Sequence, residues 1–69
     1  MRELKDIRRE NGLTKSEMAK IMGIHPKTYA NYEAGKHPIR LLPMIRLAQY
    51  LDTSLDYLFD LTDDPRPYR

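Results

Sequence analysis

The stretch that decides the fold is Lys15–Glu33, which has the sequence KSEMAKIMGIHPKTYANYE. Ala19 is small enough to let two helices cross closely, and Gly23, four residues later, permits the backbone of a tight turn. This spacing predicts a helix-turn-helix, in which two short helices cross over a turn of about three or four residues. A plain helical hairpin that uses Ala and Gly only for packing is the alternative. The side chains expected to fill the wedge between the helices are Met18, Met22, Ile24, Tyr29 and Tyr32.

The chain before the turn predicts two helices. The first covers Arg2–Glu10 and ends at Asn11–Gly12, because Gly readily adopts the left-handed conformation of a helix cap. The second covers Lys15–Met22 and begins with a capping box, in which Thr14 is the N-cap and Glu17 follows three residues later. The inward positions of these helices are Leu4, Ile7, Met18, Ala19 and Met22.

The third helix is predicted over Pro26–Ala34. Proline suits the first turn of a helix, where its missing N–H costs nothing, and His25 takes the N-cap position before it. Tyr29 and Tyr32 are three residues apart and therefore face inward together, and Gly35 ends the helix.

Two more helices are predicted after the loop Lys36–Arg40. The longer one covers Leu41–Leu51, and a short one covers Ser54–Phe59, with Thr53 and Asp56 as a second capping box. The apolar stripe of the longer helix is expected at Leu41, Met44, Ile45, Ala48 and Leu51. The predicted fold class is therefore all-α, with five helices around one core in a domain over residues 1–61 and a tail over residues 62–69.

Composition excludes several other classes of protein. The 69 residues allow one small domain, and 41% hydrophobic residues suffice for a compact fold. The sequence has no Cys and only two His, His25 and His37, so we expect neither a disulfide nor a bound metal. No apolar run approaches the about 20 residues of a membrane span, and the N-terminal segment lacks the apolar core of a signal peptide. We therefore expect a cytoplasmic protein without a cofactor.

The net charge of +2 is unevenly distributed along the chain. Residues 1–46 contain ten Lys and Arg against five Asp and Glu, whereas residues 47–69 contain two against five. A basic front and an acidic tail indicate a surface for a polyanion that does not extend over the whole molecule. The carboxylates of the acidic part lack a partner His, a nucleophile and a Gly-rich phosphate loop, so we interpret them as caps and solubilising groups rather than catalytic residues.

Three segments resemble the Xre/Cro-type helix-turn-helix family, which has the DNA-binding fold of lambdoid phage repressors. They are RELKDIRRENGLTKSEMAKIMGI, TYANYEAGK and MIRLAQYLDTSLDYLF, and the resemblance extends over Arg2–Leu61 without a gap. It implies the five-helix lambda-repressor-like fold and sequence-specific binding of double-stranded DNA by a homodimer on a two-fold symmetric operator. It also implies an ion pair between Arg8 and Glu33 that holds the recognition helix against the first helix.

The resemblance carries a set of DNA-binding positions onto this chain. They lie at the start of the second helix, on the outward face of the third, which is the recognition helix, and in the loop after it. On the recognition helix Lys27 suits guanine O6 and N7, Asn31 suits adenine N6 and N7, and Ala30 suits a thymine methyl group. The full set is Thr14, Lys15, His25, Lys27, Thr28, Ala30, Asn31, Lys36 and Arg40.

This chain departs from the family pattern at two of these positions, Lys15 and His25, and at Pro26 beside them. Lys15 stands where the family often has Gln, so it can neutralise a phosphate but cannot brace a neighbouring residue with a bidentate amide. His25 stands where Ser or Thr is common, and Pro26 cannot donate a hydrogen bond. Each position also has a plainer interpretation: a solvated helix face, a solvated loop or, for His25, a turn residue. Tyr29 and Tyr32 are interpreted as core, with base stacking as their alternative.

The function predicted from these observations is that of a DNA-binding transcriptional regulator, a repressor that blocks polymerase by occupying a promoter. A second copy is expected to bind through the last helix and the tail, at Tyr57, Phe59, Leu61 and Tyr68. In a chain of 69 residues we expect no ligand domain, so regulation would come from abundance, a partner or proteolysis. Two alternatives remain: an antitoxin of this fold that binds a protein toxin through the acidic segment after Leu51, and a protein-interaction module without affinity for DNA.

Overall fold

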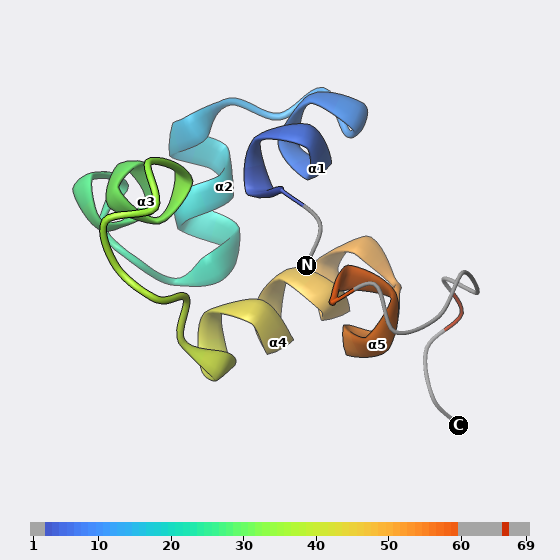
Figure 1. The fold of residues 1–69 in the computed structure, drawn as a ribbon. Helices are drawn as coiled ribbons and strands as arrows, with labels where there is room; N and C mark the ends of the chain where they lie inside the picture. The colour runs from blue at the N-terminus through green and yellow to red at the C-terminus, as the bar shows by residue number, and fades with distance from the viewer. Residues whose placement is uncertain (1–2, 60–65, 67–69) are drawn as a thin grey trace.

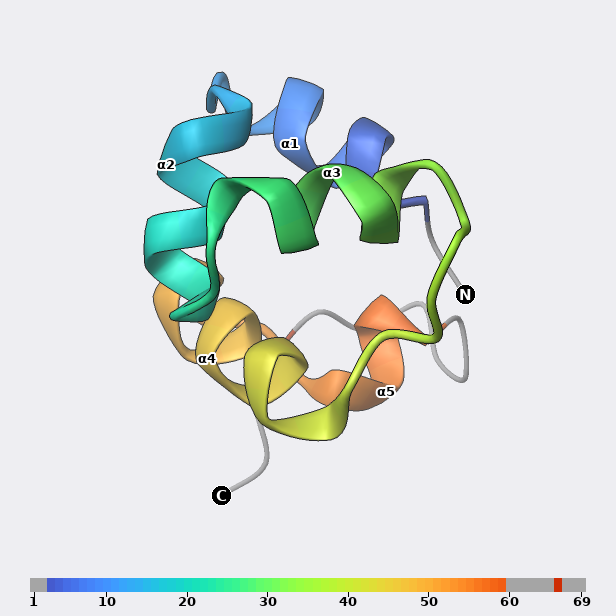
Figure 2. The same cartoon turned by 90° about the vertical axis from the view of Figure 1, so that its left-hand side faces the viewer.

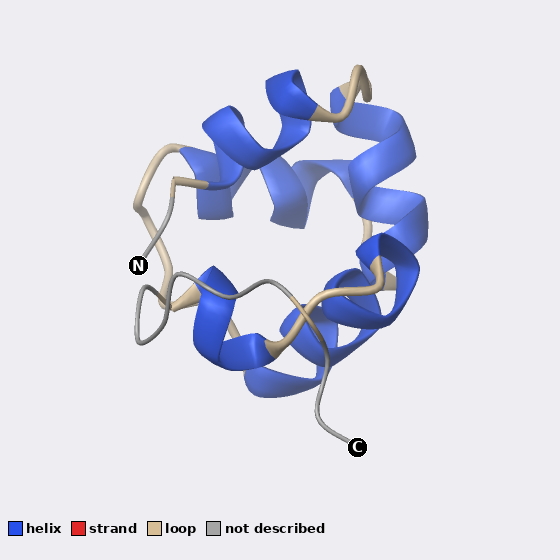
Figure 3. Ribbon diagram, turned by 90° about the vertical axis from the view of Figure 1, so that its right-hand side faces the viewer, coloured by secondary structure: helices blue, strands red, loops and turns tan. Residues whose placement is uncertain are grey.

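A computed structural model describes residues 3–59 and residue 66 of the chain, and Figure 1 shows its helices in order. Within the described residues all regular structure is helical, and Figure 3 shows no strand among them. This confirms the all-α prediction. The helices are α1 (Leu4–Glu10), α2 (Lys15–Met22), α3 (Pro26–Glu33), α4 (Leu41–Leu51) and α5 (Leu55–Leu58).

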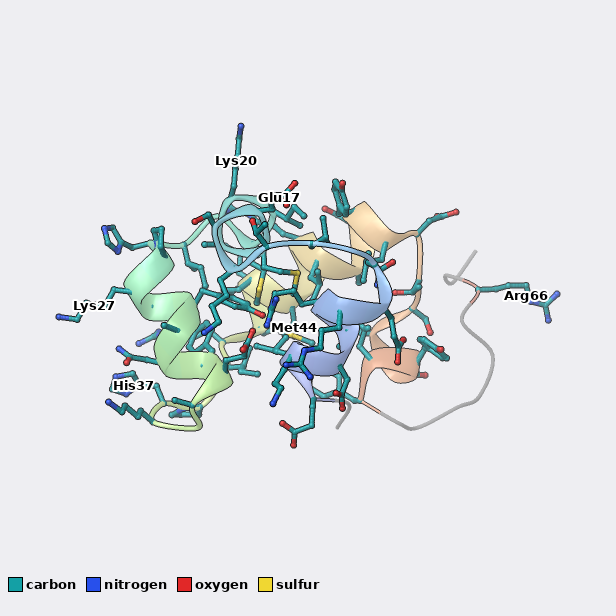
Figure 4. The ribbon with its side chains drawn as sticks, turned by 90° about the horizontal axis from the view of Figure 1, so that it is seen from above. Glu17, Lys20, Lys27, His37, Met44 and Arg66 are labelled. Carbon is teal, nitrogen blue, oxygen red and sulfur yellow. The ribbon has the colours of Figure 1, made fainter. Side chains whose placement is uncertain are left out.

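One hydrophobic core lies between these helices. Helix α2 packs against both α3 and α4, while α1 packs against α3 and α5 against α4. Met44 lies in the interior of the molecule, as Figure 4 shows from above. Because α2 has neighbours on two sides, it fixes α3 relative to the rest of the chain. The buried hydrophobic residues are Leu4, Ile7, Met18, Ala19, Met22, Tyr29, Tyr32, Met44, Leu47, Ala48 and Leu58.

The capping box predicted at the start of α2 is confirmed. The backbone N–H of Glu17 donates to Thr14 Oγ1 at 3.1 Å, and the backbone N–H of Thr14 donates to Glu17 Oε1 at 2.9 Å. The bond from the Thr14 backbone and the contact with the Thr14 hydroxyl hold the pKa of Glu17 below its ordinary value. Helix α2 therefore begins where the sequence predicts.

The turn between α2 and α3 depends on Gly23, which has φ +70°. Its N–H donates to the carbonyl of Lys20, and the N–H of Ile24 donates to the carbonyl of Ala19, which completes the end of α2. The guanidinium of Arg46 on α4 lies over the turn, where a Cβ at Gly23 would overlap Arg46 Nη1. An L-side chain at position 23 would therefore meet both backbone strain and the Arg46 side chain.

Helices α1 and α3 differ slightly from their predicted bounds. Helix α1 begins at Leu4, with Glu3 as its N-cap, and the predicted start at Arg2 lies outside the described residues. Helix α3 ends at Glu33 and Ala34 is its C-cap. Both differences concern helix ends, where the last turn has few hydrogen bonds to define it.

The predicted apolar stripe of α4 was wrong at its first position. Leu41 is 61% exposed, whereas Leu47, which was not in the stripe, is fully buried. The buried face is centred on Met44, Leu47 and Ala48, because these residues lie on the side of the helix that meets the core. Leu41 lies in the first turn of α4, at the edge of the buried face. The apolar period of the helix did not show that the core does not extend as far as Leu41.

The second predicted capping box was also wrong. Ser54, not Thr53, is the N-cap of α5, and its Oγ accepts from the backbone N–H of Tyr57 at 3.0 Å. The N–H of Thr53 donates instead to the carbonyl of Ala48, so Thr53 belongs to the end of α4. Its buried hydroxyl has no hydrogen-bond partner. The predicted boundary at residue 61 and the tail from residue 62 lie, except for Arg66, outside the described residues.

Candidate nucleic-acid interface

Helix α3 has one face in the core and the opposite face at the surface. Tyr29 and Tyr32, the two predicted core residues, are 0% and 7% exposed. Their burial turns Lys27 and Ala30 outward, where both are exposed. Figure 2 looks at this side of the molecule, where α3 runs across the front with α1 above it and α4 below. The tyrosines are therefore core residues, and the outward face of α3 is free to meet a ligand.

The predicted base-contacting positions are not equally accessible. Lys27 is exposed and projects from the edge of the molecule in Figure 4, whereas Thr28 and Asn31 are half-buried. Half-burial leaves the Asn31 side chain less accessible than that of Lys27. The structure therefore places these three side chains along one helix, with Lys27 the most accessible of them.

The start of α3 is capped by a histidine. The backbone N–H of Lys27 donates to His25 Nδ1 at 3.1 Å, which confirms His25 as the N-cap. Pro26 at the first helical position has no N–H, so the amide of Lys27 is the first one that needs an acceptor. His25 is exposed, and its side chain therefore both holds the helix start and remains at the surface.

Thr14 and Lys15 stand at the start of α2 and are both exposed. The hydroxyl oxygen of Thr14 accepts the capping bond, which leaves its hydrogen available to a further acceptor. Lys15 contributes to the lowered pKa of Glu33, so its ammonium lies within electrostatic reach of the end of α3. The start of α2 therefore lies near the C-terminal end of α3.

Lys36 and Arg40 lie on the loop between α3 and α4 and are both exposed. The N–H of Lys36 donates to the carbonyl of Asn31 at 2.9 Å, which ties the loop to the last turn of α3. A hollow of about 370 Å³ separates the loop from α3. His37 and Lys27 lie at the same edge of the molecule in Figure 4, and Arg66 lies at the opposite end. The hollow is lined by Thr28, Tyr32, His37, Pro38, Ile39 and Arg40.

A polar cluster that we call the α3 brace, formed by Arg8, Tyr29 and Glu33, holds the C-terminal end of α3 against α1. Arg8 Nε lies 2.9 Å from Glu33 Oε2, so the ion pair expected from the sequence is present. The Tyr29 hydroxyl donates to the same carboxylate oxygen. Arg8 Nη1 also donates to the carbonyl of Leu13 at 3.3 Å, which extends the brace to the loop before α2.

The α3 brace shifts the titration of its members. Burial alone would raise the pKa of Glu33, but the bonds from Arg8 and Tyr29 outweigh it and the pKa is lowered. Burial, together with the bond to the Glu33 carboxylate, raises the pKa of Tyr29 well above its ordinary value of 10.0. The carboxylate therefore stays ionised and the phenol stays protonated around neutral pH, and each form suits its partner.

The predicted surface for a second copy is not where the structure exposes apolar side chains. Tyr57 and Phe59 are half-buried against the core, and Leu61 and Tyr68 lie outside the described residues. In the described part of the chain the exposed large hydrophobic side chains all belong to α4. We call Leu41, Leu42 and Tyr50, which are 61%, 57% and 60% exposed, the α4 apolar face.

Two other kinds of site are absent from the described residues. No group of three or more His, Cys, Asp or Glu side chains there could hold a metal ion. Among residues 3–59 and 66, no helix has the length and apolar character needed to cross a bilayer.

Comparison with known proteins identifies the family. The helix-turn-helix family model matches residues 4–58. The chain is 38% identical over 64 residues to the HTH-type transcriptional regulator YobD of Bacillus subtilis, covering 93% of this chain and 57% of YobD. It is 38% identical over 55 residues to the HTH-type transcriptional regulator YqaE of the same organism, covering 80% of this chain and 47% of YqaE.

A solved structure shares the fold. The crystal structure of a transcriptional regulator from Listeria innocua superposes with a TM-score of 0.72 at 30% identity, covering 81% of this chain and 52% of that one. This chain spans about half the length of the curated relatives it matches. The family match covers every helix that the structure describes. The chain therefore belongs to the Xre-like helix-turn-helix family.

Proposed function

We propose that this chain binds double-stranded DNA in a sequence-specific manner and represses transcription as a dimer on a two-fold symmetric operator. The observation that carries the proposal is the division of α3, which buries Tyr29 and Tyr32 and turns Lys27 and Ala30 to the surface. A helix with this division can enter the major groove without losing its hold on the core. The relatives named above are transcriptional regulators, so we do not propose a catalytic function.

Lys27 and Asn31 are the proposed base-contacting residues. They are four residues apart and therefore lie on one side of α3, about one turn along the helix. A lysine donates to the acceptors of guanine, and an asparagine pairs with the donor and acceptor of adenine. Thr28 and Ala30 lie between them and have a secondary part, with Ala30 against a thymine methyl group.

Thr14, Lys15, Lys36 and Arg40 are the proposed phosphate contacts. Their side chains flank α3, at the start of α2 and on the loop after α3, and all are exposed. Hydroxyl, ammonium and guanidinium groups at these places can bind the phosphates on both sides of a major groove. His25 at the start of α3 completes the proposed site.

The α4 apolar face is the proposed surface for the second copy. Beside it, a groove of about 330 Å³ opens between α4 and α5. Arg46 is the one charged residue within α4, and because it is exposed and lies one turn from both Leu42 and Tyr50, a pair of copies must keep its guanidinium in contact with solvent. Docking two copies doubles the number of DNA contacts and supplies affinity through linked binding. The groove is lined by Ile45, Ala48, Gln49, Asp52, Thr53, Ser54 and Leu55.

The experiment that tests base contact begins with selection of bound sequences from a random duplex library. Affinities of the wild type, Lys27→Ala and Asn31→Ala are then measured over all single-base variants of the selected operator. Each substitution should abolish the preference at one position per half-site, a loss of about 1–3 kcal/mol in discrimination. Uniform loss of affinity in both variants, with every preference kept, would contradict the assignment.

The phosphate contacts are tested by the salt dependence of the same binding. Lys36→Ala and Arg40→Ala should weaken binding to all duplexes alike, and each should reduce the slope of log K against log salt by about 0.9. Lys5→Ala on the outer side of α1 removes the same charge elsewhere and is the matched control. A slope that changes as much in the control as in the loop variants would overturn the assignment.

The second copy is tested by sedimentation. Leu42→Asp should shift the chain toward the monomer and weaken binding to the two-fold operator, while binding to a single half-site stays the same. Because Leu42 is 57% exposed, the substitution should leave the fold intact. A dimer that survives this change excludes the α4 apolar face as the interface.

A further inference from the structure

The imidazole of His25 is held in one chemical form by the start of α3. Its Nδ1 accepts a hydrogen bond from the backbone N–H of Lys27 at 3.1 Å. A ring nitrogen can accept only when it carries no hydrogen, so the ring is neutral and its hydrogen lies on Nε2. Pro26 reinforces this arrangement, because it removes the N–H of the first helical position and leaves the amide of Lys27 as the first one to be capped.

The second ring nitrogen is therefore a hydrogen-bond donor without a partner. Nε2–H makes no hydrogen bond within the described part of the chain, and the His25 side chain is exposed. A serine or threonine cap has a single oxygen that bonds the helix, whereas the imidazole bonds the helix with one nitrogen and presents the other to the surroundings. The cap thus has a fixed polarity: acceptor toward the helix, donor toward solvent.

We infer that His25 is a specificity-determining residue that donates from Nε2 to N7 of a purine in the major groove. This inference rests on the proposed function, and it adds the chemical class of the group contacted. An uncharged donor discriminates against cytosine, which presents an amino donor at the groove edge, and it can be accepted by N7 of a purine; thymine presents only O4, at a different place beside its methyl group. His25 stands two residues before Lys27 in the chain, at the N-terminal end of the proposed recognition helix, the end whose residues usually contact base edges.

His25 should affect DNA binding differently from the proposed phosphate contacts. A neutral imidazole releases no counterion, so its loss leaves the salt dependence of binding unchanged. Its loss is confined to sequences with a purine at the contacted position. Lys36 and Arg40 have the opposite signature, a uniform effect on all duplexes and a change in the salt slope.

The first test concerns the protein without DNA. Nitrogen-15 NMR of histidine-labelled protein distinguishes the two neutral tautomers. His25 should show its hydrogen on Nε2 and an unprotonated Nδ1, while His37, for which the structure shows no such bond, is the internal comparison. A His25 ring that carries its hydrogen on Nδ1 overturns the inference before any binding is measured.

The second test separates the cap from the donor. His25→Ser keeps an acceptor for the Lys27 amide but has no second ring nitrogen, so thermal unfolding should be close to that of the wild type. On the selected operator, His25→Ser should lose about threefold to tenfold in affinity, the size of one neutral hydrogen bond, and should lose its purine preference at one position. His37→Ser makes the same chemical change at the other histidine and should keep every base preference.

A third test changes the contacted purine of the operator instead of the protein. Replacing it with its 7-deaza analogue removes N7 and should cost the wild type about threefold to tenfold. The same replacement should cost His25→Ser nothing further. The inference is overturned if the two changes reduce affinity independently. It is also overturned if His25→Ser loses affinity equally on all duplexes, which would indicate a phosphate contact.

If the wild type selects no sequence from the random library, the proposed function fails. If selection succeeds and His25→Ser retains every base preference, only the inference about His25 fails.

Discussion

Helices α3 and α4 contribute to the same core but present opposite chemistry to solvent. Helix α3 turns the ammonium of Lys27 and the small side chain of Ala30 outward, whereas α4 exposes the large side chains of Leu41, Leu42 and Tyr50. A cationic, hydrogen-bonding face suits a nucleic acid, and an apolar face suits another protein surface. The difference indicates that one small domain carries two separate surfaces for two kinds of partner.

The two helices are also held in different ways. The C-terminal end of α3 is fixed by the α3 brace, whose bonds meet at one carboxylate oxygen of Glu33. Helix α4 is fixed by fully buried apolar side chains such as Met44 and Leu47. Because Tyr29 and Tyr32 also pack into the core, the position of α3 depends on packing and, through the brace, on charge and pH, whereas that of α4 depends on packing. Four predictions test this contrast.

The largest effect is expected for the buried face of α4. Leu47→Ala removes a side chain that is 0% exposed and should lower the free energy of unfolding by about 2–5 kcal/mol. Leu42→Ala on the opposite face should change it by no more than about 0.5 kcal/mol. Urea unfolding of both variants measures the difference, and equal losses would show that the two faces of α4 are not distinct.

The next effect concerns the α3 brace. Glu33→Ala leaves the buried hydroxyl of Tyr29 without its acceptor and should lower the free energy of unfolding by about 1–3 kcal/mol. In a Tyr29→Phe background the same change should cost less, because the hydroxyl is already absent. A double-mutant cycle from urea unfolding checks this. Strict additivity would mean that Tyr29 and Glu33 do not act together.

The α3 brace also predicts how stability depends on pH. The folded-state pKa of Glu33 lies below its ordinary value of 4.5, so the ionised carboxylate stabilises the fold. That contribution is fully present above the ordinary value and is lost as the pH falls through the folded pKa. Glu33→Gln should therefore be less stable than the wild type at pH 7, and the difference should shrink below about pH 4. Thermal unfolding between pH 7 and pH 3 measures it; a constant difference would exclude Glu33 as the titrating group.

The smallest effect is expected at the junction of α4 and α5. Thr53 has a buried hydroxyl without a hydrogen-bond partner. Thr53→Val keeps the shape and removes that hydroxyl, so it should raise the free energy of unfolding by about 1 kcal/mol. Thr53→Ser keeps the hydroxyl and should give no such gain. A destabilised Thr53→Val variant would show that the hydroxyl has a role in the fold after all.

The parts of the fold that depend on local signals could be predicted from the sequence. Thr14 and Glu17 cap α2 through bonds that span three residues, and Gly23 takes the positive φ that its turn needs. Tyr29 and Tyr32 follow from the helical period, because few other residues of α3 could fill the core. These features need no knowledge of distant parts of the chain.

The parts that depend on tertiary neighbours could not be predicted. Helix α4 has apolar residues around much of its circumference, so its period does not show that Leu47 is covered and Leu41 is not. Thr53 and Ser54 are adjacent hydroxyl residues, and only the way in which α4 ends decides which of them caps α5. For the site, the period places Lys27 and Asn31, but the base that each contacts depends on how the helix lies against DNA.

The separation of α3 into a buried face and an exposed face has a consequence for how such a protein can change its DNA target during evolution. Apart from His25, which caps α3 and is also inferred to contact a base, the side chains proposed to choose the operator and those that bury the helix occupy separate sides of it, so these two sets can change independently. Exposed Lys27 and Ala30 can be exchanged at little cost in folding, whereas half-buried Asn31 is more constrained. A gene duplicate could therefore acquire a new set of target promoters through one or two surface substitutions and inherit its scaffold unchanged.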